Sequence, residues 1–384
     1  MKILIIALQF PPVSSGGVAY VSFNLYRAFR QFGHTVNVLA YGSKKPFRDY
    51  PGVIRLGTSP VGFLYQSFQN RKSFDLLEFD TIFIQGFSSA GLIPKLKKLQ
   101  HCNIVSVIHV STYQEMKTIR SVRDDSGLIL GKPTWEEYHT KYIRSPVLLV
   151  LEHYVYKNSH KMIGVSNATT QSAIIDYGIH PSTIKTIRNG VDFERFSYQQ
   201  TPEHIPKVRR DGHKLLLFVG ILRRIRKGVY LLLEFYRHLK KETKDIDLVI
   251  VGNGNHNTRI QKIIHRSHLN HSINVIGNID NDDLAYIYSQ ADVTIVPSLY
   301  EGLPLVALES LACGTPVAAT DIACHREIIN EKNGVLLATG NPVSWRDEIL
   351  NLLNRKIDRE QVKNSITHLN WNSIAQAYLN WAKF

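Results

Sequence analysis

The chain has 384 residues, a length that favours two domains over a single core. Its residues are 44% hydrophobic and 20% charged, which is typical of a soluble globular protein. No apolar run approaches the roughly 20 residues that a membrane-spanning helix needs, so we expect no such helix.

The formal net charge is +14, and it is concentrated in the first half of the chain. Residues 1–200 hold 23 Lys and Arg against 13 Asp and Glu, a net of +10, whereas residues 201–384 hold 23 against 19, a net of +4. Such a surface favours an anionic partner, either nucleic acid or an anionic membrane, although a basic soluble surface is an equal alternative. No nucleic-acid-binding signature accompanies the charge, so we expect no nucleic-acid partner and favour an anionic membrane or a phosphorylated acceptor.

The cysteines and the first residues bear on the compartment. Cys102, Cys313 and Cys324 show no metal-binding spacing and lie among apolar or small residues, so we expect them to be reduced. The apolar start of the chain ends at Pro11–Pro12 and is typical of a buried strand rather than a signal peptide. We therefore expect a cytoplasmic protein.

The first half alternates strands and helices. Residues 3–7 predict a strand, 18–32 an amphipathic helix ending at Gly33, and 35–39 a second strand. This βαβ pattern predicts a parallel sheet, continued by strands at 81–84, 104–108, 161–165 and 184–187. Gly16 and Gly17, before the first helix, are either a tight turn or a place where a ligand approaches the backbone.

His109 directly follows the strand at 104–108. Ligands of parallel sheets bind beyond the carboxyl ends of the strands, where Gly16 and Gln85 are also expected, so His109 is a candidate binding residue; a capping histidine is the alternative. The segment 112–146 mixes charged and aromatic residues and is either a lid over an acceptor or a surface insertion.

The second half repeats the alternation. Strands are predicted at 215–219, 247–251, 273–276, 292–296, 317–319 and 335–337, with helices at 229–240, 258–267 and 281–290 between them. We place the domain boundary near 190–212, giving an N-terminal domain of 1–190 and a C-terminal domain of 191–367. An amphipathic helix at 368–384 is predicted to pack back on the N-terminal domain.

Two stretches of the second half carry charged groups at strand ends. Between Gly220 and Gly228 lie Arg223, Arg224, Arg226 and Lys227, which suit a diphosphate or form a solvated basic loop. After the strand at 293–296, a loop with Glu301 leads into a helix that begins at Pro304, carries Glu309 and ends at Gly314. Its N-terminus predicts an anion site flanked by two carboxylates.

Other chemistries have little support. Asp245 and Asp247, and likewise Asp280 and Asp282, resemble metal-binding pairs, but the first pair begins a strand and the second caps a helix. No nucleophile or zinc-protease motif is present. We expect no bound metal and no cofactor.

Taken together, these residues make the chain resemble the retaining glycosyltransferases of family 4, which have the GT-B fold. The most specific element is Pro-Ser-x-x-Glu301-Gly-x-Pro with Glu309 and Ala-Cys-Gly-Thr-Pro. Weaker elements support it, and they are Pro11–Pro12 with Gly16–Gly17, Gly33–His34, His109, Glu152, Asn189–Asp192, Arg226–Gly228 and Gly252–Gly254.

The resemblance implies two Rossmann-like α/β domains facing across a cleft, the first binding an acceptor and the second a nucleotide diphosphate sugar. It implies transfer of the sugar, with the anomeric configuration retained, to a lipid-linked or cell-surface polysaccharide acceptor such as lipopolysaccharide. By this likeness Arg226 and Lys227 hold the diphosphate, Glu309 the ribose, and Glu301 and His109 the sugar. Backbone groups that face phosphate and sugar are those of Gly16, Gly17, Gly302, Leu303, Pro304, Leu305 and Val306.

The chain departs from the family pattern at one position. The residue after the strand-end glycine is often Arg in this family and is Ile221 here, so Arg223 and Arg224 are the candidates to take its place. The basic N-terminal half, with Lys95, Lys97 and Lys98, favours peripheral contact with the inner face of the cytoplasmic membrane. A small soluble acceptor and a non-catalytic, nucleotide-sugar-binding regulatory subunit are the alternatives.

Overall fold

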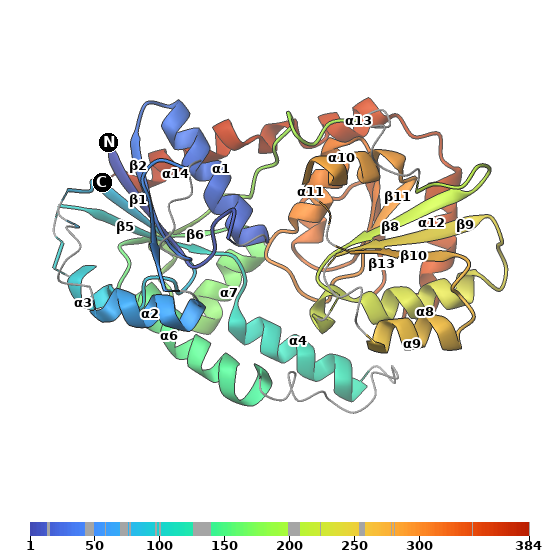
Figure 1. Ribbon diagram of the computed structural model, residues 1–384, viewed down its shortest axis with the longest axis horizontal. Helices are drawn as coiled ribbons and strands as arrows, with labels where there is room; N and C mark the ends of the chain where they lie inside the picture. The colour runs from blue at the N-terminus through green and yellow to red at the C-terminus, as the bar shows by residue number, and fades with distance from the viewer. Residues whose placement is uncertain are drawn as a thin grey trace. The chain divides into compact units, whose positions relative to one another are not determined.

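The computed structural model divides the chain into two compact units (Figure 1). The first unit comprises Met1–Met116, Pro133–Gly190 and Trp371–Phe384, and the second comprises Lys117–Lys132 and Val191–Asn370. The structure describes residues 1–13, 16–42, 50–57, 59–69, 76, 78–96, 98–99, 101–125, 140–198, 208–222, 224–252, 258–277, 279, 281–339 and 341–383. Ser14, Lys97, Arg223, Asn253, Gly254, Asp280, residues 126–139 of the segment 112–146 and residues 199–207 of the expected boundary at 190–212 therefore lie outside the described residues.

The first unit is built on a parallel sheet of seven strands in the order β3-β2-β1-β4-β5-β6-β7. The near-continuous apolar runs of its central strands are buried, as expected for a parallel sheet covered on both faces. The strands are β1 (Lys2–Ala7), β2 (Thr35–Tyr41), β3 (Val53–Leu56), β4 (Thr81–Gln85), β5 (Asn103–Ile108), β6 (Lys161–Gly164) and β7 (Ile184–Thr186).

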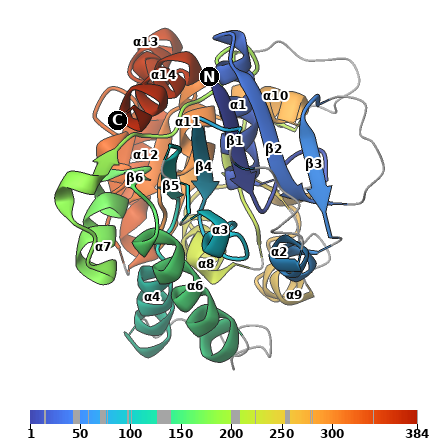
Figure 2. The same cartoon turned by 90° about the vertical axis from the view of Figure 1, so that its left-hand side faces the viewer.

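Helices cover both faces of this sheet (Figures 1 and 2). On one face, Phe83 of β4 stacks on Phe29 at 5.3 Å between ring centroids and contacts Tyr378 at 5.8 Å. These rings come from α1 (Gly17–Gln31) and from α14 (Trp371–Ala382), which is thus the expected C-terminal helix that returns to the N-terminal domain. The other face is covered by α2 (Pro60–Gln69), α3 (Ile93–Leu96), α6 (Ser145–Lys157) and α7 (Asn167–Tyr177), while α4 spans Thr112–Asp125.

The second unit contains a parallel sheet of six strands in the order β10-β9-β8-β11-β12-β13. Its strands are β8 (Lys214–Val219), β9 (Ile246–Val251), β10 (Ile273–Ile276), β11 (Val293–Val296), β12 (Val317–Thr320) and β13 (Gly334–Leu337). The helices are α8 (Val229–Leu239), α9 (Thr258–Arg266), α10 (Asn281–Gln290), α11 (Leu305–Ala312), α12 (Trp345–Asn354) and α13 (Arg359–Asn364). Each sheet lies within one unit, which confirms the two Rossmann-like α/β domains predicted from the strand pattern.

Local signals in the sequence explain several element ends. The Ser166 hydroxyl accepts from the N–H of Thr169 and caps the start of α7, as the Ser-Asn pair predicts. Gly314 ends α11 with a φ of 73°, a left-handed conformation in which an added Cβ would also contact Arg359 at 2.7 Å. Strand β3 and helix α2 were not predicted from the sequence. Strand β3 gives a weak signal, because it is four residues long and contains a buried arginine, Arg55.

Among the described residues, no helix combines the length and the apolar character needed to cross a membrane. Cys102, Cys313 and Cys324 are buried and form no disulfide.

Replacing Tyr378 by Ala should destabilise the first unit strongly, because this ring is fully buried between α14 and the sheet. Loss of a large buried ring costs about 3–5 kcal/mol, which corresponds to a fall of about 10 °C in melting temperature for a domain of this size. Thermal unfolding followed by circular dichroism measures this fall in melting temperature. Asn372→Ala, on the exposed side of the same helix, is the control and should leave the melting temperature within about 1 °C.

Candidate functional site

The carboxyl ends of β8 and β11 lie side by side in the second sheet and bring two loops into contact. The N–H of Leu299, after β11, donates to the carbonyl of Arg226, after β8, at 2.8 Å. Gly228 makes this approach possible: its φ is 71°, and an added Cβ would lie 1.8 Å from the carbonyl oxygen of Pro297. The basic loop and the acidic loop predicted from the sequence are therefore one structural feature.

Three charged side chains meet where these loops touch. Arg226 donates from Nη1 to Oε2 of Glu301 at 2.9 Å, and Lys227 donates from Nζ to Oε1 of the same carboxylate. The Ser298 hydroxyl adds a third hydrogen bond to Oε1 at 2.9 Å. Glu301 is only 6% exposed, and two cations against one carboxylate give the three charged side chains a net charge of +1.

The pKa values in this cluster reflect competition between burial and charge. Burial by itself raises the pKa of Glu301, but Lys227 and Arg226 outweigh it and hold the pKa at about 2. Burial lowers the pKa of Lys227, and the Glu301 carboxylate opposes this shift. The Glu301 carboxylate is therefore ionised at neutral pH, and the side chains of Arg226 and Lys227 are fixed against it by the fold.

Helix α11 begins directly after this cluster. No side chain caps its first turn and no acidic residue lies in it, so its leading N–H groups are candidates to bind an anion. Gly302, Leu303 and Pro304 are buried before it, while Leu305 and Val306 in its first turn are half-buried. The expectation that Pro304 is the first helical residue is wrong. Its ψ of 115° is extended and its carbonyl accepts from Ala307, so it is the N-cap.

Glu309 lies one turn further along α11. The hydroxyl of Tyr288 on α10 donates to its Oε2 at 3.0 Å. Burial raises the pKa of Glu309 to about 7, although Tyr288 and Lys227 both act to lower it. The charge of Lys227 thus acts on both carboxylates, although it contacts Glu301, and the two carboxylates differ sharply in proton affinity.

A chain of hydrogen bonds behind the cluster could not be found from the sequence. His325 donates from Nδ1 to the carbonyl of Thr320 at 2.7 Å, and the Thr320 hydroxyl donates to the carbonyl of Ser298. These contacts fix the loop that presents Ser298 to Glu301. Ser298 itself belongs to the Pro-Ser-x-x-Glu motif, and this motif was the sequence signal available for the loop.

In the first unit, His109 follows β5 as predicted. Its Nε2 donates to Oε1 of Gln85, the last residue of β4, at 2.6 Å. Burial lowers the pKa of His109 to about 4, so the ring is neutral at physiological pH. With the proton on Nε2, the Nδ1 atom is a hydrogen-bond acceptor.

Gly16 and Gly17 form the start of α1, also in the first unit. Gly16 is the N-cap with φ 156° and ψ 166°, and no side chain caps the helix. Arg55, which the sequence did not suggest, supports the preceding loop from β3. Its guanidinium donates to the carbonyls of Phe10 at 3.0 Å and Pro11 at 2.6 Å.

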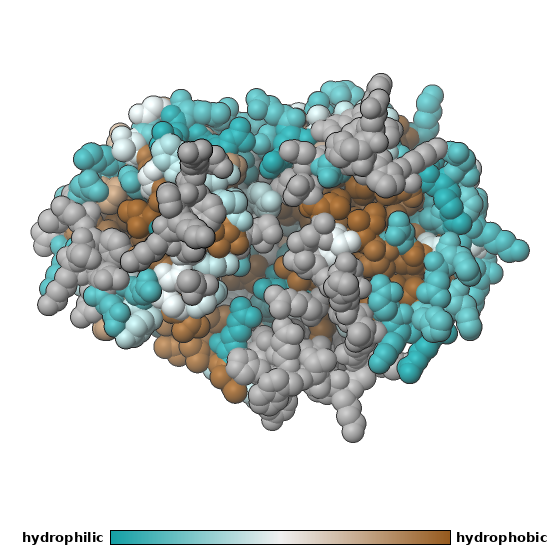
Figure 3. Space-filling view, viewed as in Figure 1, coloured by the Kyte–Doolittle hydropathy of each residue, from teal (hydrophilic) through white to brown (hydrophobic). Residues whose placement is uncertain are grey.

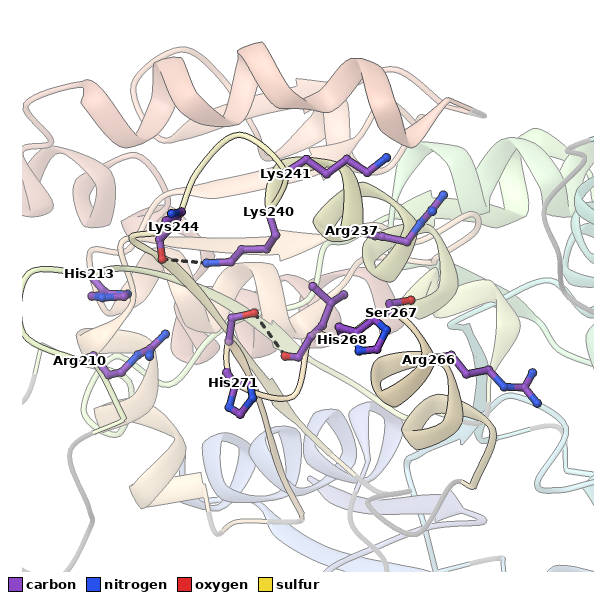
Figure 4. Close-up of a pocket in the computed structure, with 12 residues that line it drawn as sticks. Arg210, His213, Arg237, Lys240, Lys241, Lys244, Arg266, Ser267, His268 and His271 are labelled. Atoms are coloured by element: carbon purple, nitrogen blue, oxygen red, sulfur yellow. Dashed lines mark hydrogen bonds between the residues drawn. The ribbon is translucent and has the colours of Figure 1, made fainter.

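A basic hollow of about 600 Å³ lies elsewhere on the second unit (Figure 4). It is lined among others by Lys241, Lys244, Arg266 and His271, which precede β9 or β10 and so lie at the amino edge of the sheet, opposite the edge that carries Glu301. Within the described ranges, no group of three or more His, Cys, Asp or Glu residues is arranged to hold a metal ion. Asp247 instead pairs with Arg210 and His213.

Family models match both halves of the chain. Residues 15–195 match the model of Glycosyltransferase Family 4, and residues 200–368 match that of Glycosyl transferases group 1. The chain belongs to the family 4 glycosyltransferases. It is thus a transferase of the GT-B type, as the motif around Glu301 and Glu309 predicted.

Relatives of this glycosyltransferase include an uncharacterized glycosyltransferase of Methanocaldococcus jannaschii. That protein is 25% identical over 403 aligned positions, which cover 99% of this chain and 97% of the relative. A D-inositol 3-phosphate glycosyltransferase of Pseudarthrobacter chlorophenolicus is 30% identical over 206 positions, covering 51% of this chain and 48% of the relative.

Solved structures support the fold. Sucrose-phosphate synthase from Thermosynechococcus elongatus superposes with a TM-score of 0.76 at 20% identity, over 99% of this chain and 97% of that one. HepE of Anabaena, in complex with UDP and glucose, has a TM-score of 0.71 at 16% identity, over 99% and 98% of the two chains.

Glu301→Gln should destabilise the enzyme by about 3–5 kcal/mol at neutral pH, because Lys227 and Arg226 lose the buried carboxylate between them. The lowered pKa of Glu301 gives the wild type stability that is present above pH 4.5 and lost as pH falls towards 2. Denaturant unfolding should therefore show a gap between variant and wild type that narrows on acidification. Glu242→Gln, in an exposed ion pair with Arg346, is the control and should cost less than about 1 kcal/mol.

The contribution of Glu309 to stability should depend on pH in the opposite direction to that of Glu301. Its raised pKa means that the folded protein keeps a proton between pH 4.5 and 7 that the unfolded chain has lost, so stability falls as pH rises through this window. As the pH rises from 5 to 8, the melting temperature should decline less for Glu309→Gln than for the wild type. Equal slopes for both proteins would show that Glu309 is not the titrating group.

Proposed function

We propose that this enzyme transfers a sugar from a nucleotide diphosphate sugar to a lipid-linked or cell-surface polysaccharide acceptor, with retention of the anomeric configuration. The observation that carries the proposal is the buried cluster of Arg226, Lys227 and Glu301 beside the uncapped start of α11. A site of this kind suits a diphosphate, because fixed cations and helix N–H groups stabilise the charge that develops on the leaving phosphate.

The donor would be held mainly by the second unit. Lys227 and Arg226 bind the diphosphate, Glu309 accepts hydrogen bonds from the ribose hydroxyls, and Glu301 contacts the transferred sugar while it orients both cations. The backbone from Gly302 to Val306 faces the phosphate and the sugar. Arg224, a candidate to replace the arginine absent at Ile221, precedes Arg226 in the same loop and would be a further phosphate ligand.

The first unit would bind the acceptor and contribute to the donor site. His109, as a neutral ring with Nδ1 as an acceptor, would accept a hydrogen bond from a sugar hydroxyl, and Gly16 and Gly17 would admit the diphosphate close to the backbone. Arg55 would position the loop that leads to Gly16 and Gly17 without touching substrate. We place the enzyme in the cytoplasm, at the inner face of the cytoplasmic membrane, and propose that the reaction needs neither a metal nor another cofactor.

A small soluble acceptor is the second candidate. It is favoured by the relative that is named a D-inositol 3-phosphate glycosyltransferase, whereas structural neighbours such as the lipopolysaccharide outer core galactosyltransferase WaaB favour a glycan acceptor. The donor site is the same in both cases, and product analysis with the two acceptor classes distinguishes them.

A thermal-shift screen of nucleotide sugars should identify the donor, since binding to the folded state raises the melting temperature by mass action. Slow hydrolysis of that donor by the enzyme should continue in the presence of EDTA. Lys227→Ala and Glu309→Ala should reduce it at least about 100-fold, because each removes a charged contact to the donor.

Lys241→Ala, in the basic hollow at the opposite strand edge, is the control and should leave hydrolysis unchanged. Tight donor binding without turnover across a panel of acceptors would contradict the proposed transfer. Activity that disappears with EDTA and returns with a divalent cation would contradict the metal-free mechanism.

A further inference from the structure

Helices α2, α3 and α6 form one layer against the same face of the first sheet. Phe63 of α2, Ile93 of α3 and Val155 of α6 are fully buried and belong to one hydrophobic core. Figure 2 shows α2 and α6 below the sheet, on the side opposite to α1 and α14. Because their inner sides share one core, the outer sides of α2 and α6 face solvent in the same general direction.

The outer side of α6 is apolar. Val147 and Val150 are 56% and 69% exposed, and their spacing of three residues places them on one face of α6. Ile143, in the π-helical turn Thr140–Arg144 that leads into α6, is 51% exposed. Tyr142 and Tyr154 are also exposed, near the two ends of this stripe. Figure 3 shows hydrophobic side chains at the surface where α6 lies. Single exposed aliphatic residues are ordinary, but an aligned row of them marks an interaction surface.

Helix α2 repeats the pattern. Val61, Tyr65 and Phe68 are 77%, 60% and 48% exposed. Two helices of one layer thus present apolar stripes rather than the charged outer faces typical of surface helices. We name the two stripes together, with Tyr142 and Tyr154, the α2–α6 face.

The charges around α6 select the type of partner. Glu152 is the one acidic residue from Tyr142 to Lys157, and it is 4% exposed on the inner side of the helix. There its carboxylate accepts hydrogen bonds from the hydroxyls of Thr112, at 2.7 Å, and Tyr177. Arg144 and Lys157, near the two ends of the stripe, are exposed. The outer side of α6 therefore combines apolar residues with cations and carries no carboxylate.

We infer that the α2–α6 face docks the enzyme on an anionic lipid bilayer. Aliphatic side chains of a helix that lies in the membrane plane enter the boundary between headgroups and acyl chains, tyrosines suit that boundary, and cations bind the lipid phosphates. A carboxylate in the stripe would be repelled by the same phosphates, and none is present. The inference rests on the proposed function in that a lipid-linked acceptor places the reaction at this surface.

Flotation of the full chain with vesicles tests the inference. The wild type should float with vesicles of equal parts phosphatidylglycerol and phosphatidylcholine at low salt, and it should float far less with phosphatidylcholine alone or at high salt. Val147→Glu and Val150→Glu should each reduce the bound fraction about tenfold, because each places a carboxylate in the apolar stripe.

Val343→Glu is the matched control, since Val343 is 46% exposed and belongs to the second unit rather than to the α2–α6 face. It should float like the wild type. Failure of the wild type to float at low salt, or flotation of Val150→Glu equal to that of the control, would overturn the inference. So would sedimentation that shows a dimer which Val150→Glu dissociates, because the face would then bind a second copy of the chain.

A measurement of donor binding distinguishes failure of this inference from failure of the proposed function. The thermal shift with nucleotide sugar, measured without vesicles, should be the same in Val150→Glu and in the wild type, which also shows that the variant is folded. Normal donor binding with no flotation would contradict membrane docking alone. Flotation without any response to nucleotide sugars would contradict the proposed transfer and leave the docking face intact.

Discussion

The buried carboxylate of Glu301 is the constraint on which the site in the second unit depends. Burial of a lone charge is costly, so Glu301 must receive hydrogen bonds from Ser298, Arg226 and Lys227 at once. These residues come from the ends of two neighbouring strands, and Gly228 lets the two loops touch. The same contacts that satisfy the carboxylate hold both cations in place before any ligand binds, and this preorganisation suits stabilisation of the charge on a leaving phosphate.

The two glutamates of the motif have different environments despite lying close to the same lysine. Glu301 is held ionised by two cations, whereas Glu309 has Tyr288 as its hydrogen-bond donor and a pKa of about 7. Glu301 therefore acts as a structural anion that positions cations as well as a candidate sugar ligand. Glu309 can lose its proton when hydroxyl donors of a ligand arrive, which agrees with the proposed contact to ribose.

Much of the fold was predictable, because buried parallel strands leave apolar runs and the helices between them keep a regular apolar spacing. The motif around Glu301 and Glu309 likewise indicated a candidate site before any geometry was known. What the sequence did not predict depends on distant pairing. Arg55 lies on a four-residue strand and binds carbonyls more than 40 residues away, and His325 supports Ser298 only through Thr320. The exposed stripe of α6 was also missed, since a row of aliphatic residues alone predicts a buried face.

The central claim is that Lys227 and Arg226 form a diphosphate site, and calorimetric titration tests it most directly. Nucleoside diphosphates of the common bases should be compared with the corresponding monophosphates on the wild type and on Lys227→Gln. We predict that the wild type binds one diphosphate at least about tenfold more tightly than its monophosphate, and that the variant loses most of this preference. Equal preference in the two proteins would contradict the assignment of the cluster to the diphosphate.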